Sequence, residues 1–148
     1  MPTVEASITI ERSPEEVWAF LTETENIPAF ESQITRIEQV TPGEVGTGTQ
    51  WKGGTNVLGR NFDWVSEVVE FEPPYRSRTT CIEGKLAFEI TYSLSPEDGG
   101  TLFTYRIDAE SGLGGVFGKL GDPLVERAQA RTVRTNLANL KELLEADR

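Results

Sequence analysis

Four side chains in the strand-rich middle of the sequence could take part in acid–base or electrophilic chemistry. The chain contains no histidine, which removes the commonest general base near neutral pH and the commonest metal ligand. An enzyme without histidine can polarise a carbonyl group or stabilise an enolate with tyrosine hydroxyls and arginine guanidinium groups. The candidates of these types are Tyr92, Tyr105, Arg78 and Arg60. No recognisable motif unites them, so the sequence leaves the catalytic residues unknown.

The composition argues against an ordinary zinc site and against nucleotide cofactors. Cys81 is the only cysteine, whereas zinc is usually held by sets of cysteine and histidine. The glycine-rich stretch 111–118 lacks the last glycine of a dinucleotide fingerprint, and residues 118–120 lack the Ser or Thr of a P-loop. We therefore predict no cofactor and no metal. The glycine-rich stretch is either a gate over a pocket or a plain connector to the next helix.

The charge of the chain restricts its partners and its location. The net charge is −10 and the pI is about 4.5, and such a surface repels nucleic acid phosphates and anionic lipids. The N-terminal residues lack the pattern of a signal peptide, and no apolar run approaches the length needed to span a membrane. A single cysteine permits no internal disulfide. We expect a cytoplasmic protein that neither binds nucleic acid nor inserts into a membrane.

The elements needed to position these side chains follow from periodicity and from turn residues. Alternating apolar residues from Val4 to Ile10 predict a strand. Ser13 and Glu16 form a capping box for a helix that ends near Thr24, and residues 26–30 predict a second, short helix. A long helix starts at residues 122–123 and runs to about residue 146. Six further strands, separated by breakers that include Gly53-Gly54 and residues 96–100, are predicted over 33–41, 47–54, 58–72, 76–83, 86–94 and 101–109.

This order predicts one α+β domain over residues 1–148. Successive strands joined by short turns form an antiparallel meander. The apolar face of such a sheet must be covered, and only the C-terminal helix is long enough to cover it. We predict a curved seven-stranded antiparallel sheet around a long C-terminal helix, in the order β-α-α-β6-α.

Five segments in this order resemble one known superfamily. They are residues 13–21, 25–30, 46–49, 69–74 and 99–101. Together they resemble the polyketide cyclase/dehydrase (SRPBCC) family of the START-like / Bet v 1-like superfamily. The resemblance implies a helix-grip fold with an internal apolar pocket. Members of the superfamily bind lipids, sterols, polyketides or hormones, and some are cyclases or dehydratases, so the fold does not name one activity.

The predicted pocket lies between the long helix and the sheet. Gln129, Thr132 and Asn136 interrupt the apolar arc of that helix, where an unpaired buried polar group costs roughly 1–3 kcal/mol. These three side chains either line the pocket or bond to the sheet. The full set of predicted pocket residues is Phe30, Trp64, Ser66, Phe88, Ile90, Tyr92, Phe103, Tyr105, Phe117, Gln129, Thr132 and Asn136.

Three functions remain open from the sequence. The favoured one is binding or transport of a hydrophobic small molecule, such as a lipid, a polyketide, or another aromatic or isoprenoid compound. The alternative is a cofactor-free cyclase- or aromatase-like lyase or isomerase that uses tyrosine and arginine. The second alternative is a protein-interaction module that uses the basic stripe Arg127, Arg131, Arg134 and Lys141 on the opposite face of the helix.

Overall fold

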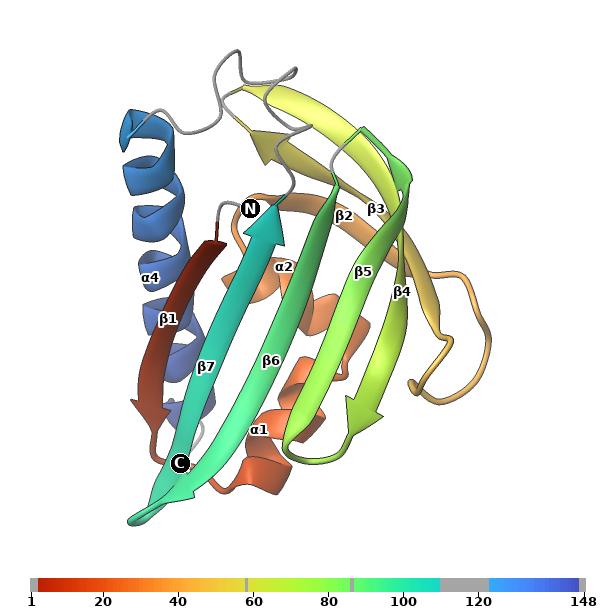
Figure 1. The fold of residues 1–148 in the computed structure, drawn as a ribbon. Coiled ribbons are helices and arrows are strands. Elements are labelled where there is room, and N and C mark those ends of the chain that lie inside the picture. The colour runs from red at the N-terminus through yellow and green to blue at the C-terminus, as the bar shows by residue number, and fades with distance from the viewer. Residues whose placement is uncertain (1–2, 58, 86, 110–122, 147–148) are drawn as a thin grey trace.

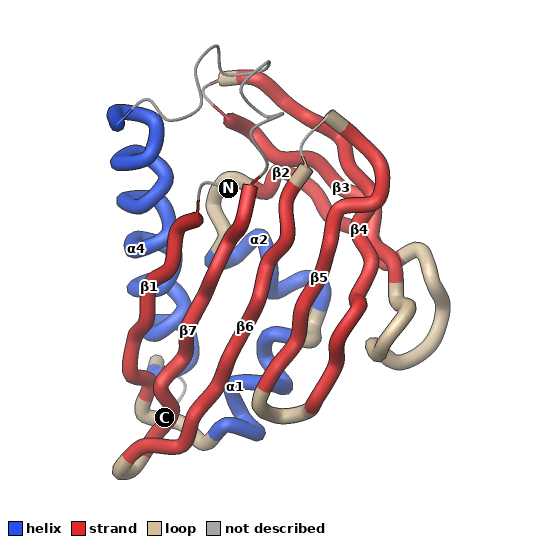
Figure 2. Tube along the Cα trace, viewed as in Figure 1, coloured by secondary structure: helices blue, strands red, loops and turns tan. Residues whose placement is uncertain are grey.

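The computed structural model describes residues 3–57, 59–85, 87–109 and 123–146 (Figure 1). Within these ranges it confirms the predicted architecture, a curved seven-stranded antiparallel sheet with a long C-terminal helix. The helices all lie on the inner side of the sheet (Figure 2). The elements are β1 (Thr3–Ile10), α1 (Pro14–Leu21), a 3-10 helix (Thr24–Asn26), α2 (Ile27–Phe30), β2 (Ile34–Gln39), β3 (Gln50–Val57), β4 (Arg60–Glu72), β5 (Arg76–Gly84), β6 (Phe88–Glu97), β7 (Gly100–Ala109) and α4 (Pro123–Glu145).

The predicted capping box starts α1. The Ser13 hydroxyl accepts a hydrogen bond from the Glu16 backbone, and the Glu16 carboxylate accepts one from the Ser13 backbone. The helix ends at Leu21, earlier than the predicted end near Thr24. The Thr22 hydroxyl donates to the carbonyl oxygen of Trp18 at 3.1 Å, and such side-chain bonding to the backbone competes with continued helix.

The strands are ordered β1-β7-β6-β5-β4-β3-β2 across the sheet, and each neighbouring pair is antiparallel. Two of the predicted strand boundaries are wrong. Gly53-Gly54 lies inside β3, where Gly53 is paired with Trp64 of β4. The strand β6 continues through Pro96 and Glu97, so the turn to β7 is confined to Asp98 and Gly99. Gly99 has a φ of 76°, which suits glycine in a tight turn.

The helix α4 packs beside β1 and α2 (Figure 1). Its side chains Val133, Leu137, Leu140 and Leu144 are buried in the core. Leu143 is 41% exposed, because it lies at the border of the apolar arc near the end of the helix. Arg127, Arg131 and Arg134 are exposed, as predicted. Lys141 instead bonds the carbonyl oxygen of Thr9 at 2.7 Å, which ties the helix to β1. No helix in the described part of the chain combines the length and apolar character needed to cross a membrane.

Two apolar clusters lie on the inner face of the sheet. The far-end cluster consists of Phe62 and Trp64 on β4, with Trp51, Cys81 and Phe88 packed against them. The larger cluster, which we call the helix-side core, joins α1, α2 and α4 to β1, β6 and β7. Its buried members are Ile10, Val17, Trp18, Leu21, Ile27, Phe30, Leu94, Phe103, Tyr105, Val133, Leu137, Leu140 and Leu144.

Candidate functional site

A buried carboxylate lies where α2 ends. Glu31 follows Phe30 directly, and its backbone N–H still bonds the carbonyl oxygen of Ile27 at 2.9 Å. Its φ and ψ of −90° and 87° then take the chain out of the helix. The residue is only 1% exposed. Burial of a carboxylate is costly unless hydrogen bonds compensate it, so the partners of Glu31 define this part of the molecule.

Two tyrosines on neighbouring strands donate to this carboxylate. The Tyr92 hydroxyl donates to Oε2 of Glu31 at 3.0 Å, and the Tyr105 hydroxyl donates to Oε1 at 2.7 Å. Tyr92 and Tyr105 are directly paired across β6 and β7, and their ring centroids are 5.7 Å apart. Because paired residues point to the same face of a sheet, the two hydroxyls reach one carboxylate from the same side.

The hydrogen bonds around Glu31 extend to the C-terminal helix through the side-chain amides of Gln33 and Asn136. Asn136 of α4 is 4% exposed, and its Oδ1 accepts from the backbone N–H and the hydroxyl of Ser32 at 3.3 and 3.0 Å. Its Nδ2 donates to Oε1 of Gln33 at 2.8 Å, and Gln33 Nε2 lies 3.5 Å from Oε1 of Glu31. We call Glu31, Tyr92, Tyr105, Gln33 and Asn136 the Glu31 network. It joins the sheet, the chain after α2, and α4.

The surroundings of Glu31 change its proton affinity. Burial raises the pKa of Glu31 above its ordinary value of 4.5, and hydrogen bonds from Tyr105, Tyr92 and Gln33 act in the opposite direction. Burial also raises the pKa of both tyrosines well above 10.0, with the nearby Glu31 charge as a further cause. The hydroxyls therefore stay protonated as donors, while the carboxyl group holds its proton to higher pH than an ordinary glutamate. This combination suits proton transfer or recognition of a polar group.

Several predicted pocket residues lie beside this network. Phe30 and Phe103 are fully buried in the helix-side core, and Ile90 packs against it. Asn136 bonds to the chain after α2, so its polar groups have protein partners rather than bonds to the sheet. Thr132 on the same helix is partly buried. The side chain of Gln129 and the whole of Phe117 lie outside the described residues.

The other predicted pocket residues lie at the far end of the same inner face. Trp64 and Ser66 are buried on β4, as their alternation predicts. Phe88 of β6 meets Trp64 edge-on, with ring centroids 5.9 Å apart. The predicted set therefore divides into a group around the Glu31 network and a group in the far-end cluster.

The two candidate arginines, Arg78 and Arg60, do not lie beside the tyrosines. Arg78 is paired with Thr91, the residue before Tyr92, so strand alternation places it on the opposite face. There it forms ion pairs with Glu70 at 2.8 Å and with Glu89 at 3.2 Å. Arg60 is exposed at the start of β4, with its guanidinium carbon 5.5 Å from the centroid of the Phe62 ring. The charged partner of the tyrosines is Glu31.

Part of the inner face remains accessible although helices lie against it. Ile90 and Ile107 are directly paired on β6 and β7 and point inward, yet both are only partly buried. Thr79 on β5, paired with Ile90, is also partly buried. These residues separate the Glu31 network from the far-end cluster. Apolar side chains that stay accessible beside a few polar groups are typical of small-molecule sites.

Comparisons with known proteins agree with this architecture. Residues 1–145 match the model of a family described as polyketide cyclase / dehydrase and lipid transport. Protein TTHA0849 from Thermus thermophilus is similar in structure with a TM-score of 0.79, at 24% identity over 98% of both chains. A START superfamily protein from Mycobacterium smegmatis gives a TM-score of 0.78, at 16% identity over 97% of both chains.

A conserved protein from Geobacillus kaustophilus gives a TM-score of 0.79, at 18% identity over 97% of this chain and 95% of that one. No curated protein matches the sequence. The structural neighbours support the fold, and the family model covers almost the whole chain. The chain belongs to the polyketide cyclase / dehydrase and lipid transport family, and it has the START/Bet v 1-like helix-grip fold.

Proposed function

We propose that the protein binds a hydrophobic small molecule on the inner face of the sheet, with the Glu31 network at the polar end of the site. The observation that carries the proposal is the Glu31 carboxylate, clamped by Tyr92 and Tyr105 beside apolar side chains that remain accessible. The family and the fold are those of proteins that bind hydrophobic ligands.

Stability alone gives no reason for a carboxylate at this position. Replacing buried ionic groups by apolar residues of similar volume is often neutral or stabilising. A buried acid with a raised pKa is therefore a candidate for a functional group. Ile90 and Ile107 supply an apolar surface next to it, which suits the body of a lipid, a polyketide, or another aromatic or isoprenoid molecule.

Filling the accessible part of the inner face should weaken ligand binding. We expect Ile90→Trp to weaken binding of the neutral fluorescent probe N-phenyl-1-naphthylamine by about tenfold or more. The larger ring occupies space that the probe needs, and the apolar contacts that the probe then loses are worth about 1.4 kcal/mol or more of binding free energy. The measurement is a fluorescence titration. Ser95→Trp, at an exposed position of the same strand, is the matched control and should bind as the wild type does. Equal affinity in all three proteins would contradict the proposal.

A second candidate function is a cofactor-free lyase or isomerase, which the raised pKa of Glu31 beside two tyrosine hydroxyls favours. In this reaction Glu31 removes a proton from the carbon next to a substrate carbonyl group. The tyrosine hydroxyls, released by the protonated carboxyl group, then donate to the enolate oxygen. Arginine has no role in it.

Glutamine at position 31 separates binding from turnover. We expect Glu31→Gln to bind a poly-β-carbonyl substrate analogue within a few-fold of the wild-type affinity, while turnover falls by about 100-fold or more. Mass spectrometry of the products measures the turnover. If neither protein converts the analogue, the lyase or isomerase function is contradicted and only the proposed binding function remains.

The proposal also includes a location. Cys81 is the single cysteine of the sequence, and a reducing compartment such as the cytoplasm suits a protein without disulfides. The expected partner is a small molecule, and a net charge of −10 disfavours nucleic acid as a partner.

A further inference from the structure

The strands β5 and β6 separate near one end of the sheet. Their ladder runs from the pair Arg76–Ser93 to the pair Thr80–Glu89 and ends there. Beyond Thr80, the strand β5 stays paired with β4 as far as Gly84. The sheet is therefore continuous on one side of β5 and open on the other, between Cys81 and Phe88.

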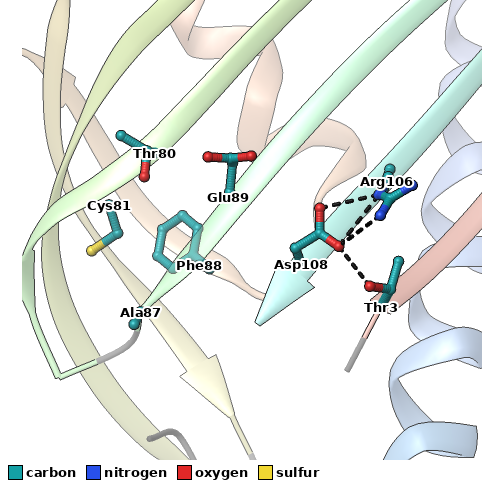
Figure 3. Close-up of a pocket in the computed structure, with 8 residues that line it drawn as sticks. All are labelled: Thr3, Thr80, Cys81, Ala87, Phe88, Glu89, Arg106 and Asp108. Carbon is teal, nitrogen blue, oxygen red and sulfur yellow. Dashed lines mark hydrogen bonds and ion pairs between the residues drawn. The ribbon is translucent and has the colours of Figure 1, made fainter. Parts of the chain in front are cut away.

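A hollow of about 480 Å³ lies at this separation and is partly open to solvent. Figure 3 shows Thr3, Arg106 and Asp108 on one side of it, and Cys81 and Phe88 on the other. Its lining residues are Thr3, Thr80, Cys81, Ala87, Phe88, Glu89, Arg106 and Asp108.

The lining joins the outer surface of the sheet to its interior. Cys81 and Phe88 also pack against Phe62 and Trp64, so they belong to the far-end cluster on the inner face. Glu89 lies beside inward-pointing Phe88 and Ile90 in β6 and therefore points outward, where it forms an ion pair with Arg78. The hollow thus has outward polar groups at its rim and inner-face apolar groups at its floor.

We propose that this separation of β5 and β6 is a side entrance through which the apolar ligand reaches the inner face; the inference rests on the proposed binding function. The floor, formed by Cys81 and Phe88, packs against Trp64. Phe88 lies two residues before Ile90 on β6, and Ile90 belongs to the accessible part of the inner face. Passage here breaks no ladder hydrogen bond between β5 and β6, because their pairing has already ended.

The rim selects for uncharged molecules. Arg106 forms an ion pair with Asp108 at 3.1 Å, and Asp108 also accepts a hydrogen bond from the Thr3 hydroxyl at 2.6 Å. Glu89 is likewise paired with Arg78. Since the charges at the rim are already compensated, a ligand with a net charge gains little there, whereas a neutral molecule with a small polar end can hydrogen-bond in passing. The class of ligand is therefore a neutral, mainly apolar molecule.

An entrance affects rates and leaves equilibrium affinity almost unchanged. The experiment measures association and dissociation of N-phenyl-1-naphthylamine by stopped-flow fluorescence in the wild type and in Ala87→Trp, whose ring fills the hollow. We expect both rate constants to fall by about tenfold, with a change in Kd of less than about twofold. Ser95→Trp is the matched control for an added tryptophan and should keep the wild-type rates.

Chemical modification tests the same entrance without relying on that variant to fold. Cys81 is the only thiol, so a bulky maleimide attached to it blocks the hollow in the wild-type sequence, and Cys81→Ser treated in the same way is the control. Slower exchange of the probe in the labelled protein supports the entrance. Unchanged rates in both the labelled protein and Ala87→Trp would overturn it while leaving the binding function intact. A weaker Kd with an unchanged association rate would also overturn it, because the hollow would then be part of the binding site. If the wild type binds no probe, the binding function and the entrance both fail.

Discussion

Replacing Glu31 with glutamine is expected to remove a loss of stability that the wild-type protein suffers as the pH rises. The folded state raises the pKa of Glu31 above its ordinary value of 4.5. Between pH 4.5 and that higher pKa, the folded protein keeps a proton that the unfolded chain has already released. The stabilisation is complete below pH 4.5 and is lost as the pH rises through the folded-state pKa. Glutamine has no such proton, so the free energy of unfolding of Glu31→Gln minus that of the wild type should rise with pH across this window.

Urea unfolding at closely spaced pH values measures this difference. Each unit by which the folded-state pKa exceeds the unfolded one contributes about 1.4 kcal/mol to it. Glu44→Gln, at an exposed position in the β2–β3 loop, is the matched control for the loss of one carboxylate. If plots of the free energy of unfolding against pH stay parallel for Glu31→Gln and the wild type, the environment of Glu31 does not raise the pKa of its carboxyl group.

The Glu31→Ala variant measures how much the hydrogen bonds to Glu31 contribute to stability. Glu31→Ala leaves the hydroxyls of Tyr92 and Tyr105 without their acceptor in the interior. Each buried donor left unpaired costs roughly 1–3 kcal/mol, so we expect a loss of about 3 kcal/mol below pH 4.5. The loss should become smaller at higher pH, because the wild type loses its own stabilisation from Glu31 there. A variant that lost the carboxylate with little change in stability would mean that water or another group takes over as acceptor.

Most of the fold could be predicted because its signals are local. The alternation of Val4 to Ile10 needs only neighbouring residues to predict β1, and the capping box at Ser13 lies within four residues. The inward facing of Trp64 and Ser66 likewise follows from period two. These patterns predict which face of each strand is buried, and so they predict most residues of the inner face.

The charged centre of the site could not be predicted in this way. Glu31 is separated from Tyr92 by 61 positions and from Tyr105 by 74 positions in the sequence, and no periodicity connects them. A single glutamate after a short helix is usually solvent-exposed. The one available signal was the position of Glu31 directly after buried Phe30, at a helix end that faces the sheet. Arg78 and Arg60 are candidates by residue type alone, and their positions in the strands place them away from the tyrosines.

The predicted turn at Gly53-Gly54 is wrong for a physical reason that can be tested. Glycine pairs often mark turns, but a glycine inside a strand often marks the close approach of another group. A Cβ atom at Gly53 would lie 2.5 Å from the carbonyl oxygen of Arg36 and 2.7 Å from Cη2 of Trp64. The Trp64 ring is held there by the hydrogen bond from its Nε1 to the Thr55 hydroxyl at 2.8 Å. The glycine is needed for packing rather than for a turn.

Gly53→Ala should therefore destabilise the protein by about 3 kcal/mol, measured by urea unfolding. Neither contact relaxes easily, because Arg36 contributes a backbone atom and Trp64 is fixed by Thr55. Displacement of the ring should also change the near-ultraviolet circular dichroism of the far-end cluster. Gly46→Ala is the matched control, since a Cβ atom there meets nothing within 4 Å, and its stability should change by less than about 1 kcal/mol. Equal stabilities of the two variants would show that β3 shifts away from Trp64 at little cost, and the inner face would then be more deformable than its packing implies.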